Sequence, residues 1–402
     1  MLELLIAILL GVTAGIITGL IPGIHVNLIS IVLISVSGYL LGFTSPLILA
    51  VFIIAMAITH TFLDSIPSIF LGAPDADMAL AVLPDHRLLL EGKGYEAVKL
   101  TVIGSLLSLI VCVAIIPFMI PLAPLIYKFL QPYIGYILIA IVAYMILIER
   151  KANKIFWSFV IFTLSGILGM IVLTLPNLKQ PLFPMLSGLF GLSVLLISLN
   201  QKVSLPKQRV TESITIKKKN KIKAISAAVF SGSLTGLFPG LGAAQAAVIA
   251  MQFVGNIGMY AFMVMIGGIN TVNFLFSLVT FYTLQKARNG AIVAVMEIIK
   301  SISITELIIL VSAALITGSI ATYLALSLSK IFSKVINKVN YNMLIIGVIS
   351  LITILVFLFS SWLGLLILIT STAIGIIAPS LGVKRTHSMG CLLLPVILFF
   401  IL

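Results

Sequence analysis

The sequence predicts an all-α polytopic membrane protein, and three observations support this prediction. Of the 402 residues, 61% are hydrophobic and only 9% are charged, and the mean hydropathy is +1.29. Soluble domains are about half apolar and about a quarter charged, so this chain cannot cover itself with a polar surface. Its apolar residues also gather into about 14 runs, most of them near the length that crosses a bilayer as a helix. A soluble enzyme, a disordered chain and a nucleic-acid-binding protein are excluded.

Seven apolar runs precede a polar linker and seven follow it, and we expect each run to be helical. The first set lies at 3–21, 24–41, 46–63, 98–116, 132–148, 155–175 and 182–199. The second set lies at 224–238, 242–254, 258–281, 304–328, 341–358, 361–378 and 387–402. Cys112 and Cys391 fall inside apolar runs, which indicates buried thiols rather than a disulfide or a metal site.

The two halves resemble each other, which divides the chain into a first repeat (1–199), a basic linker (200–223) and a second repeat (224–402). GIITGLIPG at 15–23 matches GSLTGLFPG at 232–240. Weaker pairs follow in the same order: Glu96 with Glu306, Trp157 with Trp362, Gly169 with Gly375 and Gly188 with Gly390. An odd number of crossings in each repeat predicts that the second repeat is inverted in the membrane.

Loop charge gives an independent indication of this topology. The net charge of +13 reflects basic loops, which remain on the cytoplasmic side of a plasma membrane. The linker has eight basic residues and one acid, so we place it in the cytoplasm. The basic loops at 149–154, 330–338 and 384–385 then fall on the same side, as inversion requires. The basic stretch at 284–303 falls on the opposite side and does not fit.

The two Pro-Gly motifs form the first candidate site. Proline and glycine end one helix and free the N–H groups that open the next, and these groups suit an anion. Inverted repeats with interrupted helices are typical of secondary transporters that bind substrate near the midplane. A tight turn between two helices is the structural alternative. We predict an organic-anion site formed by Thr18, Gly19, Pro22, Gly23, His25, Asn27, Thr235, Gly236, Pro239, Gly240, Gly242 and Gln245.

The second candidate site lies at 59–77, where ionisable residues occur at membrane depth. His60 and Asp64 are four residues apart and share one face of a helix. An ionisable residue inside the membrane is a functional candidate, here for binding sodium or a proton. The alternative is a His60–Asp64 pair at a helix end near the interface. Pro67 and Pro74 indicate a second broken segment. We predict a coupling-ion site formed by Thr59, His60, Asp64, Ser65, Asn270 and Asn273.

The polar stretch at 78–97 predicts a short surface helix and a turn at 92–94, solvated on the cytoplasmic side. The sequence contains no P-loop, no His/Cys cluster with metal spacing and no Gly-x-Ser-x-Gly nucleophile. We therefore expect neither an enzyme nor ATP-driven transport, and no cofactor besides the coupling ion.

These motifs resemble the TctA family, the large membrane subunit of tripartite tricarboxylate transporters. The resemblance rests on Gly-x-x-Pro-Gly at 19–23 and 236–240, on SIPSIFLGAP at 65–74 and on LPDHRLLLEGKG at 83–94. It implies a carboxylate permease driven by an ion gradient, supplied in tripartite systems by an extracytoplasmic binding protein and a small membrane subunit. The short chain is similar to stand-alone archaeal members.

The leading expectation is a secondary transporter for a small organic anion, and two alternatives remain open. A lipid transporter that moves a polyprenyl phosphate between leaflets would use the same helix N-termini for the phosphate. An intramembrane hydrolase would pair Asp64 with Asp75 or Asp77, although these two look interfacial. A lateral opening between the halves would favour the lipid, and a closed midplane pocket would favour the small anion.

Overall fold

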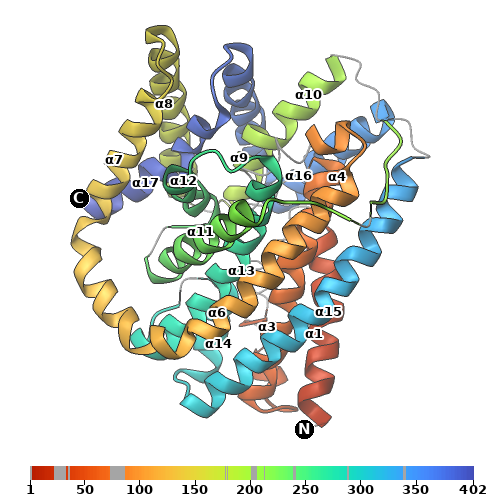
Figure 1. Ribbon diagram of the computed structural model, residues 1–402, viewed down its shortest axis with the longest axis vertical. Coiled ribbons are helices and arrows are strands. Elements are labelled where there is room, and N and C mark those ends of the chain that lie inside the picture. Colours follow the sequence, from red (N-terminus) through yellow and green to blue (C-terminus); the bar gives the residue numbers. More distant parts are fainter. Residues whose placement is uncertain are drawn as a thin grey trace.

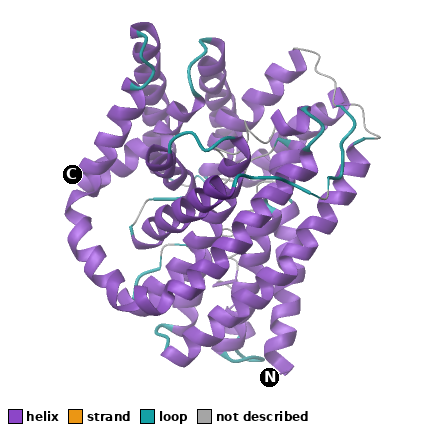
Figure 2. Cartoon of the chain, in the orientation of Figure 1, coloured by secondary structure: helices purple, strands orange, loops and turns teal. Residues whose placement is uncertain are grey.

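The computed structural model (Figure 1) is mainly helical, and the part of the chain that it describes has no strand (Figure 2). It describes residues 2–21, 33–34, 37–72, 87–176, 178, 180–200, 206–211, 213–238, 241–287, 289–337 and 341–402. Eight helical stretches within these ranges are long and apolar enough to cross a membrane. The prediction of an all-α polytopic membrane protein is confirmed.

The first half of the chain builds one flank and a curved column. Its elements are α1 (Leu2–Leu20), α3 (Pro46–Leu63), α4 (Ser65–Leu71), α6 (Gly94–Leu130), η2 (Gln131–Tyr133), α7 (Ile134–Leu147), α8 (Ala152–Thr174), α9 (Leu182–Leu186), η3 (Ser187–Leu192) and α10 (Ser193–Asn200). Helix α1 packs along α3 on one flank of the molecule (Figure 1). The run from α6 through η2 to α7 curves around the opposite side (Figure 1).

The second half supplies the central helix of the molecule. Its elements are α11 (Lys218–Leu237), α12 (Ala243–Val254), α13 (Met259–Leu284), α14 (Gly290–Ile299), α15 (Ile304–Ile336), α16 (Tyr341–Ser380), η4 (Arg385–Met389) and α17 (Gly390–Ile401). Helix α13 is buried along nearly its whole length and packs against both α6 and α11. Helix α15 crosses to the first half and packs against α3.

Most predicted runs became helices with ends within a few residues. The span labelled α16 contains two helices that meet at non-helical backbone at Ser361, whose φ is 55°, so the predicted runs at 341–358 and 361–378 are separated where the prediction places the break. The stretch at 284–303 was predicted to be a loop, which is wrong, because it contains α14. The Asn289 side chain accepts the N–H of Ala291 and caps this short helix. The run at 24–41 lies mostly outside the described residues.

Helices α6 and α13 cross with their backbones in direct contact. A Cβ atom on Gly104 of α6 would collide with the Val264 carbonyl of α13, and one on Gly267 of α13 would collide with the Thr101 carbonyl of α6. The Ser105 hydroxyl donates to the Gly267 carbonyl at 3.0 Å across this crossing. Small residues let membrane helices approach closely enough for dispersion and hydrogen bonding to hold them together. This crossing joins the first half of the chain to the second.

Residues paired in the sequence occupy matching places in the two halves. Glu96 is the third residue of α6, and Glu306 is the third residue of α15. Gly169 of α8 packs against the backbone of α17, while Gly375 of α16 packs against the backbone of η3. A structural repeat would produce such matched contacts. The repeat boundaries and the inverted orientation of the second half remain predictions.

Residues 206–211 of the linker lie across the turn that precedes α6. The Gln208 side chain accepts the N–H of Gly94 at 2.9 Å and donates to the Leu89 carbonyl at 2.9 Å. Its backbone N–H donates to Asn337 Oδ1 at 2.6 Å, and the N–H of Arg209 donates to the Gly92 carbonyl. The linker therefore ties the end of α15 to the start of α6.

This covering corrects the prediction that the 78–97 stretch is solvated. Leu88, Leu89 and Glu96 are buried, and α6 already begins at Gly94. A turn does occur at the predicted place, since Gly92 has a φ of 77°. The part from 78 to 86 lies outside the described residues.

Candidate substrate and coupling-ion site

Half of the predicted anion site can be placed. Pro22, Gly23, His25, Asn27, Pro239 and Gly240 lie outside the described residues. Helix α1 ends at Leu20 and α11 ends at Leu237, so each helix stops directly before its Pro-Gly motif. Gly19 and Gly236 lie in the last turns, together with Thr18 and Thr235, which are both buried.

Gln245 has a capping role at the start of α12. Its Oε1 accepts the N–H of Gly242 at 2.9 Å, which satisfies one of the donors at this helix N-terminus. The sequence predicts Gln245 as one of the residues of the organic-anion site, and that role stays a prediction. In this structure its Oε1 orders the backbone of the turn before α12.

Two of the predicted coupling-ion residues, Asp64 and Asn270, meet in the structure, and a third, His60, contacts α1. Asn270, in the middle of α13, donates its Nδ2 to Asp64 Oδ2 at 2.9 Å. Both residues are buried, with exposed fractions of 1% and 4%. His60 Nδ1 lies 3.2 Å from the hydroxyl of Thr18 on α1. Asp64, directly after the end of α3, thus contacts α13, and His60, one turn before it on α3, contacts α1.

A helix break places Asp64 at this position. Asp64 separates α3 from α4, and Pro67, in the first turn of α4, has no N–H to give to the Leu63 carbonyl. The next backbone bond, from the N–H of Ser68 to the Asp64 carbonyl, is long at 3.4 Å. The chain continues as helix on both sides of the break, so Asp64 is held inside the bundle rather than at a loop.

Two further oxygens near these residues are buried and have no hydrogen-bond partner in the described part of the protein. They are Thr59 Oγ1 and Asn270 Oδ1. Buried polar atoms are almost always hydrogen-bonded, so such exceptions call for an explanation.

Asn273 follows Asn270 by one turn on the same face of α13. Carboxylate, amide and hydroxyl oxygens are the donors that hard cations prefer. No group of three or more His, Cys, Asp or Glu suited to a metal occurs in the described ranges.

The glycine contacts show which residues of α13 correspond to those of α3. Gly19 of α1 lies against His60 and Leu63, and Gly236 of α11 lies against Phe276 and Ser277. Matching these contacts pairs Leu63 with Phe276, and therefore Asp64 with the neutral Ser277. The acid of this site is supplied by the first half and its amides by the second.

A cavity of about 1050 Å³ lies beyond the last turn of α12. Its walls come from both halves: the turn before α6, the end of α7, η3, the segment from α12 into α13, and residues 384–386. Sequence reasoning missed this cavity, because it assigned Arg87 to a surface helix and Lys384 and Arg385 to a topology signal. The available clue was the position of Arg385 at the very start of an apolar run.

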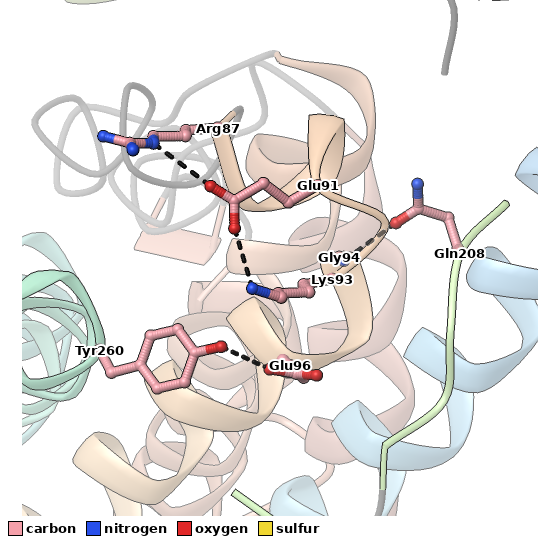
Figure 3. A network of polar contacts seen from close by, with 7 residues as sticks. All are labelled: Arg87, Glu91, Lys93, Gly94, Glu96, Gln208 and Tyr260. Carbon is pink, nitrogen blue, oxygen red and sulfur yellow. Dashed lines mark hydrogen bonds and ion pairs between the residues drawn. The ribbon is translucent and has the colours of Figure 1, made fainter. Parts of the chain in front are cut away.

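Figure 3 shows a network of charged side chains, of which Arg87 and Glu91 line this cavity. Glu91 accepts from Arg87 Nε at 3.3 Å and from Lys93 Nζ at 2.9 Å. Close by, the Tyr260 hydroxyl of α13 donates to Glu96 of α6 at 2.7 Å. The bond between Tyr260 and Glu96 joins the start of α6 to the start of α13.

The charge state of this network predicts a pH dependence of stability. The hydrogen bond from Lys93 lowers the pKa of Glu91 from its ordinary value of 4.5. The contribution of Glu91 to the free energy of unfolding is therefore fully present above the unfolded-state pKa of its carboxyl group. It is lost as the pH falls through the lower folded-state pKa. We expect Glu91→Gln to lower stability by less than about 1 kcal/mol at pH 7, because the pair is partly exposed. The difference should vanish in acid below the folded-state pKa. Thermal unfolding of both proteins at several pH values measures this, and a difference that persists unchanged in acid would contradict the assignment.

Comparison with known proteins adds to this geometry. Residues 5–390 match the family model described as Tripartite tricarboxylate transporter TctA family. The chain is also similar to a protein of Methanocaldococcus jannaschii described as uncharacterized, with 30% identity over 410 aligned positions that cover 99% of each chain. No solved structure gives a significant match.

Proposed function

Because the chain belongs to the TctA family of tripartite tricarboxylate transporters, a family of membrane transporter subunits, we propose that it is a secondary active permease for a small organic anion, a carboxylate. The observation that supports this best is the buried Asp64–Asn270 hydrogen bond between the two halves of the chain. A carboxylate inside a membrane bundle is costly to keep charged, and such residues mark ion and proton pathways in transporters.

Asp64 is the proposed coupling-ion residue. A sodium ion or a proton bound there would neutralise the carboxylate, which lowers the cost of moving the site across the membrane core. The oxygens of Thr59 and Asn270 are available to such an ion. His60, Ser65 and Asn273 complete the proposed set. Because Asn270 belongs to the second half, ion binding would also change the contact between the halves.

The proposed substrate site remains the pair of helix starts that follow Gly23 and Gly240. The ends of α1 and α11 directly before both motifs support it, since each helix stops where a new set of backbone N–H groups is to begin. Substrate carboxylate oxygens would accept from these groups near the midplane. The family's tripartite organisation makes an extracytoplasmic binding protein and a small membrane subunit the proposed partners.

Uptake into proteoliposomes tests the proposal. Radiolabelled citrate and succinate are offered to the purified protein under an inward sodium gradient, under a proton gradient, and with neither. We expect accumulation of one of them above its external concentration only with a gradient. Equal uptake with and without either gradient, or none above protein-free vesicles, would overturn the proposal.

A polyprenyl-phosphate translocase is the second candidate, and the apolar lining of the cavity beyond α12 favours it. A lipid carrier needs hydrocarbon walls beside a phosphate site, whereas a small tricarboxylate does not. Movement of a fluorescent polyprenyl phosphate between vesicle leaflets, without gradient-driven carboxylate uptake, would support this function instead.

A further inference from the structure

Arg385 is a buried cation without an acidic partner in the described part of the chain. Its exposed fraction is 7%, and its Nη1 donates a hydrogen bond to the Ser193 hydroxyl at 3.3 Å. The guanidinium remains charged at neutral pH. Buried charges are normally paired, because leaving one uncompensated in a low-dielectric interior is unfavourable.

The other cations around the same cavity already have partners. Arg87 pairs with Glu91 at 3.3 Å. Lys384 lies 3.9 Å from Glu149, which also receives His387 at 3.1 Å. Arg385 is thus the one lining cation, among the described residues, that an incoming anion would neutralise without first breaking an ion pair.

The remaining walls are mainly hydrocarbon. Eleven of the 20 lining residues have apolar side chains, and four of these are methionines. Methionine is flexible and polarisable, so walls rich in it adapt to apolar ligands of irregular shape. The volume of about 1050 Å³ lies at the upper end of the range of ligand pockets and far exceeds a single carboxylate group.

The charge and the lining together select one class of ligand. A small tricarboxylate brings three negative charges to one unpaired cation and presents a hydrated surface to apolar walls. An anion with a single charged headgroup and a large apolar body matches both features: the headgroup neutralises Arg385, and the body removes apolar wall from water.

We infer that this cavity is a binding site for such an amphipathic anion, either a hydrophobic carboxylate or a lipid phosphate. The headgroup contacts the Arg385 guanidinium, beside Thr386, and the apolar body lies against Met145, Phe190, Phe262 and Met265. The inference rests on the transport function proposed above and names the chemical class of anion that this cavity would hold.

Binding to the protein in phosphatidylcholine nanodiscs, which supply no anionic lipid, tests the inference. The probes are dodecanoate, farnesyl phosphate and citrate, titrated by calorimetry with empty nanodiscs subtracted. We expect dodecanoate or farnesyl phosphate to bind, and whichever binds more tightly identifies the carboxylate or the phosphate source. Arg385→Gln should weaken that binding at least tenfold. The matched control is Arg209→Gln, an exposed linker arginine, which should bind like the wild type.

A second variant keeps the test decisive if Arg385→Gln does not fold. Gln252 lines the cavity from α12 and is partly exposed, so Gln252→Trp fills the space while leaving the arginine in place. We expect it to abolish binding of the amphipathic anions at an unchanged unfolding temperature. Citrate binding as tightly as both amphiphiles, or full amphiphile binding in Gln252→Trp, would overturn the inference.

The two proposals fail in different ways. Gradient-driven citrate uptake by a protein that binds neither amphiphile would remove the amphipathic site and keep the permease. Amphiphile binding that depends on Arg385, without gradient-driven uptake of any anion, would keep the site and remove the permease.

Discussion

Replacing Asp64 with asparagine should abolish the dependence of anion uptake on the cation gradient while leaving the fold intact. Asparagine has nearly the same shape, and its Oδ1 can still accept the hydrogen bond that Asn270 now donates to Asp64 at 2.9 Å. The variant cannot bind a proton or neutralise a sodium ion at this position. We expect gradient-driven uptake to fall at least tenfold, to the level seen without a gradient, with an unchanged unfolding temperature.

The control is Glu297→Gln, which removes an exposed carboxylate whose partner in the described part of the chain is Lys300, three residues further along. This variant should transport like the wild type. Asn270→Leu removes the partner instead and leaves the carboxylate of Asp64 without this donor, so it should lower both stability and uptake. Gradient-dependent uptake that survives in Asp64→Asn would show that the coupling ion binds elsewhere.

Replacing Gly104 with alanine should destabilise the protein by about 1–3 kcal/mol, the usual cost of overpacking a tight contact. The added methyl group would collide with the backbone carbonyl of Val264. Neither partner can move aside as a flexible side chain would, so α6 and α13 must separate. The separation would also stretch the hydrogen bond from Ser105 to Gly267. Thermal unfolding in nanodiscs measures the loss.

Gly347→Ala is the matched control for this variant. Gly347 lies on the exposed face of α16, and a Cβ atom there meets nothing within 4 Å. Because alanine has a higher helix propensity, stability should be unchanged or rise by up to about 1 kcal/mol. Equal unfolding temperatures for Gly104→Ala and the wild type would mean that the helices do not approach this closely in the membrane.

The sequence by itself determined the fold class and most helix positions. The run predicted at 46–63 is α3, Pro46–Leu63, and the run at 3–21 differs from α1 by one residue at each end. This success has a local cause: backbone groups in lipid must be satisfied within the helix, so apolar length alone fixes where helices lie. The helix ends before both Pro-Gly motifs follow from local chemistry in the same way.

Part of the candidate site was also accessible from the sequence, because buried polar residues stand out in apolar segments. Asp64 and Asn270 were both selected on that ground. Their hydrogen bond was not predictable, since it joins residues 206 positions apart and depends on how α3 and α13 are rotated. The sequence identified Gln245 as a polar residue near the turn. Only the structure shows that its side chain accepts a hydrogen bond from the backbone of that turn.

Only the tertiary structure revealed the cavity, the covering of the turn before α6 and the burial of Arg385. A short basic segment looks the same in sequence whether it faces water or a cavity, so the sequence predicts only a topology signal at Arg385. In the structure the guanidinium of Arg385 contacts Ser193, 192 positions away. The linker likewise covers residues 88–96 through Gln208, more than a hundred positions downstream. Composition and hydropathy indicate whether a segment favours water or lipid. The burial of a charge depends instead on which distant segments surround it.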